Sequence, residues 1–234
     1  RRNEIIRQLQ EDGVMDLNKE LPLPRVIKRV AVISSATAAG YGDFCNQLEQ
    51  SGYEFTIQLF PATMQGNQVE SSVIAALDTI AAELNEWDVV VIIRGGGAAT
   101  DLNGFDSYLL AANVAQYPLP ILTGIGHERD DTIIDLVAHT RLKTPTAVAA
   151  FLIERRGNEA ALLQNLKERL LHAVQQRLNN EKSQFEVLLQ RNRLGINQQM
   201  TYQRQWLERL SHRFELTSSQ YVGVQRKALM RLSL

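Results

Sequence analysis

Two hydrophobic patterns alternate along the first two thirds of the chain. Short runs that are apolar throughout are followed by longer stretches in which apolar residues recur every three or four positions. A continuous apolar run favours a strand buried on both faces, and the three-to-four spacing favours an amphipathic helix. The predicted strands are 29–35, 53–60, 88–94 and 119–125, and the predicted helices are 1–12, 37–51, 69–84, 105–116 and 132–139.

Strand and helix follow one another strictly from residue 29, and this order predicts the fold class. We expect an α/β fold, a doubly wound parallel sheet of about four or more strands, covered by helices on both faces over 29–150. The run at 53–60 is apolar on one side, which is typical of an outer strand. Residues 1–28 are expected to form a linker helix and an extended approach segment, because Pro22 and Pro24 disfavour helix before them.

The pattern changes after Pro145. From residue 146 onward there is no proline, and apolar residues such as Leu163, Leu166 and Leu170 recur at heptad-like spacing. We expect 151–234 to form a long, projecting, antiparallel helical (coiled-coil) arm of two helices, with a turn near 193–197. The apolar stripe of such an arm needs the other helix or a partner chain to cover it.

The charge is divided unevenly between these two regions. Residues 1–150 hold 11 Lys and Arg against 19 Asp and Glu, a net charge of −8, and residues 151–234 hold 14 against 7, a net charge of +7. A basic region suits a polyanion or an acidic protein as partner. Basic residues also occupy the solvated faces of long helices, so charge alone leaves both interpretations open.

Composition excludes several classes of protein. The chain has one cysteine, Cys45, which rules out an internal disulfide framework and a multi-cysteine zinc site and agrees with a reducing, cytoplasmic location. Cys45 follows Phe44 and is expected to be a packing residue. No apolar run approaches the ~18 residues that span a bilayer, and the charged first residues do not resemble a signal peptide, so we expect no membrane association.

Candidate anion-binding chemistry follows the predicted strand at 88–94. Arg94 ends this strand and Gly95, Gly96 and Gly97 come next. Glycines let backbone N–H groups approach an anion closely, although they also serve in tight turns. The guanidinium of Arg94 matches two phosphate oxygens and favours the anion-binding interpretation.

A cluster of titratable residues follows the predicted strand at 119–125. His127 can transfer protons near neutral pH, and Asp130, three residues later, can orient its imidazole. We expect Asp131 to cap the helix that begins at residue 132, which leaves Asp130 for the site.

The loop after the first strand supplies the remaining candidates. Ser35 or Thr37 is expected to cap the next helix, and Asp43 is either a solvated acid near the start of that helix or a group that points toward His127. Four side chains could together hold one divalent ion, but no fixed ligand spacing is present, so no required metal is predicted although Mg²⁺ is possible. These are Asp43, His127, Asp130 and Asp131.

Three stretches together carry a family resemblance. They read VAVISSATAAGYGDF, VVVIIRGGGAATDLNGFD and PILTGIGHERDDTIIDLVAHTRLKTPTAVAA. With the helical region that follows, the chain resembles the exodeoxyribonuclease VII large subunit family over about residues 1–225. Thr100 and Asn103 depart from the family pattern, which usually has Glu and Trp there. The resemblance implies a catalytic set of Asp43, Arg94, His127 and Asp130 and a phosphate-binding set of Arg94, Gly95, Gly96 and Gly97.

The resemblance also implies an activity and partners. Members of this family cut single-stranded DNA from either end to give 5′-phosphorylated oligonucleotides, without a required divalent metal. They bind several copies of a helical small subunit on the arm, and an oligonucleotide-binding barrel precedes the catalytic domain. We therefore expect this chain to be the catalytic domain and part of the coiled-coil region, without that barrel. A non-catalytic nucleotide- or anion-binding module with a helical scaffold arm is the alternative.

Overall fold

A five-stranded parallel sheet forms the centre of the fold, as the alternation of strand and helix predicts. The computed structural model describes residues 2–95, 99–125 and 131–232. The strand order is β2-β1-β3-β4-β5, with all pairs parallel. The chain adds β2 on one side of β1 and β3, β4 and β5 on the other, so the strand order reverses between β1 and β3. β2 lies at an edge, as its one-sided pattern predicts. The strands are β1 (Arg29–Ser34), β2 (Thr56–Pro61), β3 (Val89–Ile93), β4 (Ile121–Gly124) and β5 (Thr140–Leu142).

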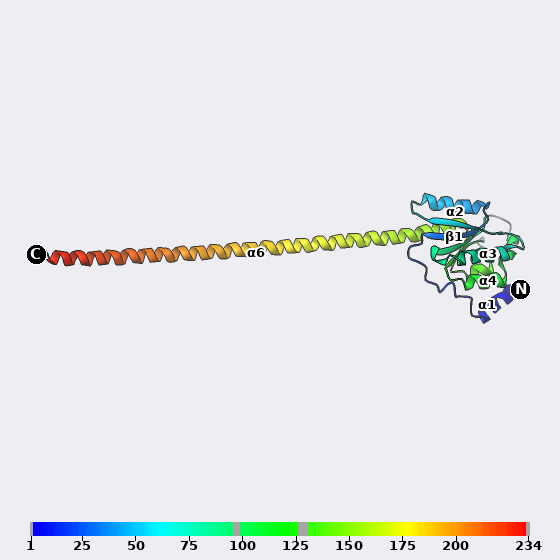
Figure 1. Cartoon of the computed structure of the whole chain (residues 1–234), viewed down its shortest axis with the longest axis horizontal. Coiled ribbons are helices and arrows are strands. Elements are labelled where there is room, and N and C mark those ends of the chain that lie inside the picture. Colours follow the sequence, from blue (N-terminus) through cyan, green and yellow to red (C-terminus); the bar gives the residue numbers. More distant parts are fainter. Residues whose placement is uncertain (1, 96–98, 126–130, 233–234) are drawn as a thin grey trace. The chain divides into compact units, whose positions relative to one another are not determined.

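Helices cover both faces of this sheet (Figure 1). The helices are α1 (Arg2–Glu11), α2 (Ala39–Gln50), α3 (Val69–Ala81), α4 (Tyr108–Ala115), α5 (Ile133–Val137) and α6 (Pro145–Leu232), with two short 3₁₀ helices, η1 (Leu84–Glu86) and η2 (Ala99–Phe105). Of α6, the first turns contribute to the core. Figure 1 shows α2 on one side of the sheet and α3 and α4 on the other.

The core is divided by the sheet into two apolar clusters. Along β1, Val30 and Val32 pack into the cluster formed with α2 and the first turns of α6, while Ala31 and Ile33 pack into the cluster formed with α1, α3, α4 and α5. Successive residues of a strand point to opposite faces, so a strand apolar at every position is buried on both. This explains why the continuous apolar runs predicted these strands well.

The fifth strand was not predicted from the sequence. β5 has three residues and pairs in parallel with β4, with Leu122 opposite Thr140 and Gly124 opposite Leu142. A strand this short has no recognisable hydrophobic run of its own. It follows α5, which ends at Val137 rather than at the predicted His139.

A buried asparagine ties the segment between α1 and β1 to the sheet. The Asn18 side-chain amide donates to the carbonyl oxygens of Tyr117 (3.0 Å) and Leu119 (2.9 Å). Its oxygen accepts from the backbone N–H groups of Ile121 (2.9 Å) and His139 (3.0 Å). Because a buried polar group is costly unless it is satisfied, these four bonds fix the segment against the starts of β4 and β5.

A charged clasp joins β1 and β3 at the end of the sheet where these strands begin. The Asp88 carboxylate accepts from the backbone N–H groups of Lys28 and Arg29, both at 2.8 Å, and from the Arg29 guanidinium, also at 2.8 Å. Burial raises the pKa of Asp88, but the hydrogen bonds from Arg29 and Lys28 outweigh it, so the pKa of the carboxyl lies below its ordinary value.

We expect Asp88→Asn to lower the free energy of unfolding at pH 7 by about 1–3 kcal/mol, because the charged acceptor of these bonds is lost. A folded-state pKa below the unfolded value means that the contribution of Asp88 is present above about pH 4 and disappears as the pH falls through the lower, folded value. Urea unfolding from pH 7 to pH 3 measures this. Asp78→Asn, an exposed change on α3, is the control, and a difference that stays constant down to pH 3 contradicts the assignment.

The predicted turn at 193–197 is wrong. α6 is one continuous helix of 88 residues that passes through this region, so the described chain does not form the expected antiparallel pair there. Gly195 costs a helix only about 1 kcal/mol relative to alanine, and no proline follows Pro145 to break the backbone hydrogen bonding.

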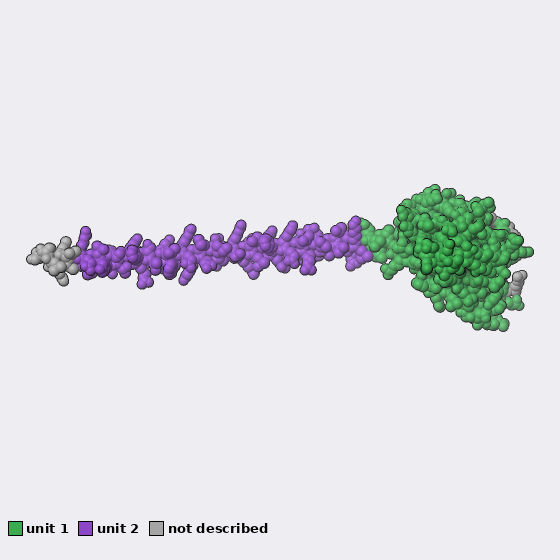
Figure 2. Space-filling model, in the orientation of Figure 1, with its two compact units in different colours: residues 1–165 green, residues 166–234 purple. Residues whose placement is uncertain are grey.

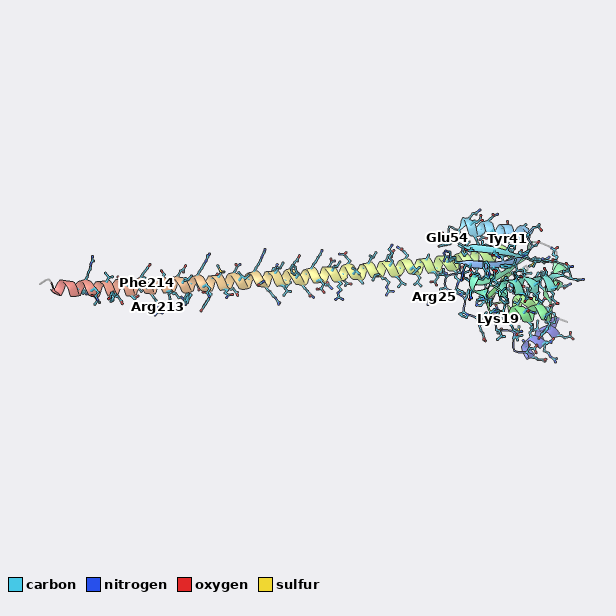
Figure 3. The ribbon with its side chains drawn as sticks, viewed as in Figure 1. Lys19, Arg25, Tyr41, Glu54, Arg213 and Phe214 are labelled. Carbon is cyan, nitrogen blue, oxygen red and sulfur yellow. The ribbon has the colours of Figure 1, made fainter. Side chains whose placement is uncertain are left out.

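The chain divides into two compact units, residues 1–165 and residues 166–234, coloured separately in Figure 2. In the second unit every side chain from 166 to 227 is exposed. Large apolar groups are among them: Phe214, labelled in Figure 3 beside Arg213, is 73% exposed. These apolar residues keep the heptad-like spacing seen in the sequence, so this part of α6 presents unburied apolar surface.

Across 2–95, 99–125 and 131–232, no helix is both long enough and apolar enough to traverse a bilayer.

Candidate functional site

A hollow of about 530 Å³ lies at the edge of the sheet where the strands end. Three segments surround it: the end of β3, the loop from β1 into α2, and the loop from β2 toward α3. In open α/β sheets, ligands bind at this edge where the strand order reverses, which here is between β1 and β3. The lining residues are Ser35, Thr37, Ala38, Ala39, Ala62, Thr63, Met64, Gln65, Arg94 and Gly95.

Arg94 supplies a permanent positive charge to this hollow. It follows the last residue of β3, and only 5% of its surface is exposed. Its backbone N–H donates to the carbonyl oxygen of Gly124 (3.2 Å), so β3 and β4 end side by side. A guanidinium in a largely desolvated position interacts more strongly with an anion than one in open water, because water screens it less.

The start of α2 forms the facing wall of the hollow. Its N-cap residue is Ala38, with no side-chain capping bond, so the prediction that Ser35 or Thr37 caps this helix is wrong. The hydroxyl groups of Ser35 and Thr37 instead lie 3.3 Å apart and bond to each other. A helix start carries partial positive charge on N–H groups that lack partners within the helix. Together with Arg94, it makes the hollow suited to an anion.

Two glycines allow α2 and the end of β3 to approach closely. A Cβ placed on Gly40 would lie 3.0 Å from Gly95 Cα and 2.9 Å from the Pro145 ring. A Cβ placed on Gly95 would lie 3.2 Å from the Gly40 nitrogen and 3.1 Å from the Ala38 side chain. Any side chain here would therefore push the helix start away from Arg94 and widen the anion-binding end of the hollow.

Gly40→Ala is expected to weaken the binding of inorganic phosphate in the hollow at least about tenfold and to destabilise the fold by about 1–3 kcal/mol, because the added methyl meets backbone and a proline ring that cannot rotate away. Gly42→Ala is the matched control. A Cβ at Gly42 meets nothing within 4 Å, and alanine favours helix, so this variant should be slightly more stable and should bind phosphate as the wild type does. Calorimetric titration with phosphate and thermal unfolding of both variants measure the effect, and a Gly40→Ala protein with wild-type affinity contradicts it.

The TPTAVA stretch packs directly against the site. Thr144 caps α6 by accepting a hydrogen bond from the Ala147 N–H (3.1 Å), and Pro145 is the first residue of the helix. A Cβ placed on Gly124, at the end of β4, would lie 2.7 Å from Val148 and 2.9 Å from the Thr144 carbonyl oxygen. The stretch does not line the hollow itself, but it positions the start of α2 and the end of β4.

The structure describes only some of the predicted site residues. Arg94 and Gly95 line the hollow. Asp43 is exposed on α2, one helical turn beyond Ala39 and on the same side of the helix, but it does not line the hollow. Gly96, Gly97, His127 and Asp130 lie outside the described residues.

The helix after β4 is capped differently from the prediction. Thr132, not Asp131, is the N-cap of α5, and it forms a reciprocal capping box with Asp135. Asp131 instead accepts two hydrogen bonds from the guanidinium of Arg141 on β5. A nearby arginine fork satisfies both oxygens of a carboxylate, whereas a cap uses one, so Asp131 pairs across to β5.

Cys45 is a packing residue, as predicted. It is partly buried on α2 and free. Burial raises the pKa of the Cys45 thiol, despite its hydrogen bond with Tyr41, and burial together with that bond raises the pKa of Tyr41 to about 12. Both groups are neutral at pH 7, so neither provides a nucleophile there.

Among the described residues, no group of three or more His, Cys, Asp or Glu side chains is arranged to hold an ion. Two of the four side chains that could supply ligands, His127 and Asp130, lie outside those residues.

Sequence reasoning missed one wall of the hollow. The loop after β2 contributes Ala62, Thr63, Met64 and Gln65, whereas the predicted site used only the loops after the other three strands. Because all parallel strands end at the same edge, any loop that follows a strand next to β1 is a candidate. The sequence signal was present, since the strand at 53–60 was predicted beside this loop.

The fold and the hollow define the protein as a doubly wound α/β protein with a cationic site at the edge where the strand order reverses. The family profile described as exonuclease VII, large subunit, matches residues 14–234, and the chain belongs to this family.

Three relatives show the extent of the similarity. The exodeoxyribonuclease 7 large subunit of Deinococcus radiodurans is 42% identical over 164 residues, which are 67% of this chain and 39% of that protein. Those of Lactobacillus helveticus (34% over 180 residues; 75% and 40%) and Bordetella parapertussis (35% over 172 residues; 74% and 37%) are also similar. The chain therefore spans about 40% of the length of the curated relatives it matches.

Proposed function

We propose that this chain is the catalytic part of an exonuclease that hydrolyses phosphodiester bonds of single-stranded DNA. The enzyme works from both ends of the strand and releases 5′-phosphorylated oligonucleotides. Family membership supports the reaction class, and the hollow formed by Arg94, Gly95 and the start of α2 is the observation that carries the proposal. It combines a largely buried guanidinium with a helix start, which together suit a phosphate group.

The chemistry divides among four residues. Arg94, with the N–H groups of Gly95, Gly96 and Gly97, binds the phosphodiester and stabilises the charge that develops in the pentavalent transition state. His127 exchanges a proton with the attacking water or with the leaving oxygen, and Asp130 orients its imidazole. Asp43 positions or activates the water. Asp43 is exposed on the same side of α2 as Ala39, which lines the hollow, and one turn beyond it, and this position supports the role.

In this proposal the reaction needs no divalent metal. Arg94 supplies the positive charge that a metal ion gives to other phosphodiesterases, and it does so through two oriented N–H donors. Addition of EDTA tests this directly, since a metal-dependent enzyme stops and this one continues.

The experiment uses a 5′-labelled single-stranded oligonucleotide, the protein assembled with its small subunit, and excess EDTA. We expect acid-soluble products that carry 5′-phosphates. Binding of the oligonucleotide without products supports the alternative, a non-catalytic nucleotide- or anion-binding module. Activity that EDTA abolishes contradicts the metal-free mechanism.

The exposed part of α6 is the proposed docking region for several copies of the exodeoxyribonuclease VII small subunit. Residues 166–227 present large apolar side chains to solvent, and such surface on a soluble protein marks an interaction site. Light scattering of the chain mixed with the small subunit measures the mass of the complex. An unchanged mass contradicts this assignment.

A further inference from the structure

The hollow has two ends of different chemistry. Because β2 and β3 lie on either side of β1, Arg94, which follows β3, and the loop after β2 lie at opposite ends of the hollow, and the proposed mechanism uses the end with Arg94. The other end comes from the loop after β2 and is uncharged, with the hydroxyl group of Thr63, the thioether of Met64 and the amide of Gln65. A volume of about 530 Å³ lies within the range of about 300–1,000 Å³ that small-molecule sites occupy, so the hollow has room for more than a phosphate group.

We propose that this uncharged end is a subsite for the nucleoside next to the bound phosphate, with Gln65 as its main polar contact. The inference rests on the proposed function, since it places a second part of the same substrate. A phosphodiester carries a nucleoside on each side, so a group bound at Arg94 brings one of them to the neighbouring wall. That wall is formed by Met64 and Gln65.

The side chains of this wall suit a nucleobase. Gln65 is exposed, and its amide offers both donors and an acceptor. Met64 is only 5% exposed because it packs into the core cluster, so it gives this wall an apolar surface that a base can lie against. The edge of every base presents a hydrogen-bond donor, an acceptor or both, and the Gln65 amide can pair with each of these. Gln65 therefore adds affinity without selecting one base.

The loop that carries these residues is held in place by the rest of the fold. The Ala62 N–H donates to the Ser34 carbonyl oxygen (2.9 Å), and the Thr63 N–H donates to the Ser72 hydroxyl (2.8 Å). The loop then turns sharply at Gly66, whose φ of 77° favours glycine. A wall fixed in this way binds a ligand without first having to order itself.

The charge of the lining agrees with a nucleic-acid substrate. Among the lining residues that the structure describes, none is acidic and Arg94 carries the charge. A strand that enters the hollow therefore meets no repulsion from the lining at the nucleoside end.

The test compares a homopolymeric single-stranded oligonucleotide with the same strand containing one abasic residue. The enzyme is the protein assembled with its small subunit, as wild type, Gln65→Ala and Gln68→Ala. Gln68 is the matched control because it is an exposed glutamine three positions away that does not line the hollow. Cleavage of the bonds that flank the abasic residue is compared with cleavage of the same bonds in the intact strand.

We expect the wild type to cut the flanking bonds roughly tenfold more slowly when the base is missing, the loss that one good hydrogen-bonded contact produces. Gln65→Ala should cut the intact strand roughly tenfold more slowly, through a higher KM, and should show nearly no further loss at the abasic residue. Gln68→Ala should behave as the wild type. A Gln65→Ala enzyme that keeps the full wild-type preference for the intact strand overturns the subsite and leaves the nuclease assignment standing.

A wild-type protein that cleaves neither strand overturns the nuclease assignment. A second measurement then tests the nucleoside subsite by itself. The chain is then titrated with thymidine 5′-monophosphate by calorimetry. Binding that Gln65→Ala weakens about tenfold and Gln68→Ala leaves unchanged supports the subsite. Equal affinity in all three proteins, or no binding, overturns it.

Discussion

Arg94→Ala is expected to lower the rate of single-stranded DNA hydrolysis by at least ~10², while the protein stays folded. Arg94 is the charged residue among the described lining of the hollow, where we propose that the phosphate binds. Removing it withdraws the positive charge that the transition state requires. Because oriented donors in a desolvated site act mainly on the transition state, the loss should appear in kcat rather than in KM alone.

Two further variants sharpen this prediction. Arg94→Lys keeps the charge but not the planar pair of donors, so it should restore only part of the rate. Arg25→Ala is the control for loss of a guanidinium, since Arg25 is exposed in the segment between α1 and β1, is labelled in Figure 3 and does not line the hollow. Circular dichroism and thermal unfolding show whether each variant is folded. A folded Arg94→Ala protein with near-normal activity removes Arg94 from the mechanism.

His127→Ala is expected to lower turnover by a similar factor, at least ~10², because general acid–base catalysis contributes about 10²–10⁴. The wild-type rate should change with pH as an imidazole gains or loses its proton, and this dependence should be lost in the variant. Added imidazole should restore part of the activity. These readouts separate proton transfer from a purely structural role.

His139→Ala is a useful contrast. The imidazole of His139 bonds to the Leu21 carbonyl oxygen (3.1 Å) and to the Thr140 hydroxyl, and burial lowers its pKa despite the bond to Leu21. Its loss should reduce stability and leave the pH profile of the reaction unchanged. A His127→Ala enzyme that retains the wild-type pH profile contradicts the proposed role of His127.

Much of the sheet was predictable because strands buried on both faces are apolar at nearly every position, and this pattern is visible in the sequence. β1 and β3 are apolar at nearly every position, and each contributes residues to both core clusters. β5 was missed because its three residues become a strand only by pairing with β4. For the long helix the error was in the other direction. The sequence predicted two antiparallel helices with a turn near 193–197, but the structure has one helix there, because an exposed glycine such as Gly195 is too weak a signal to end a helix.

A site residue was predictable where a charged side chain directly follows a buried strand in the sequence. Arg94 follows a buried strand, so its position at the sheet edge came directly from the pattern. Helix caps were less predictable. Ser35, Asp131 and Thr132 each carry an oxygen that could cap the helix that follows it, and contacts in the folded protein determine which of them does so. Asp131 pairs with Arg141, a partner that exists only once β5 has joined the sheet. The wall that carries Gln65 was overlooked because none of its side chains is charged.

We propose that the scissile phosphate binds between Arg94 and the start of α2. A crystal structure of the protein soaked with a phosphorothioate-linked thymidine dinucleotide, which resists hydrolysis, tests this. We expect the phosphorus in this hollow, with its oxygens accepting hydrogen bonds from the Arg94 guanidinium. A dinucleotide bound with its phosphate elsewhere on the protein, and this hollow empty at saturating concentration, would contradict it.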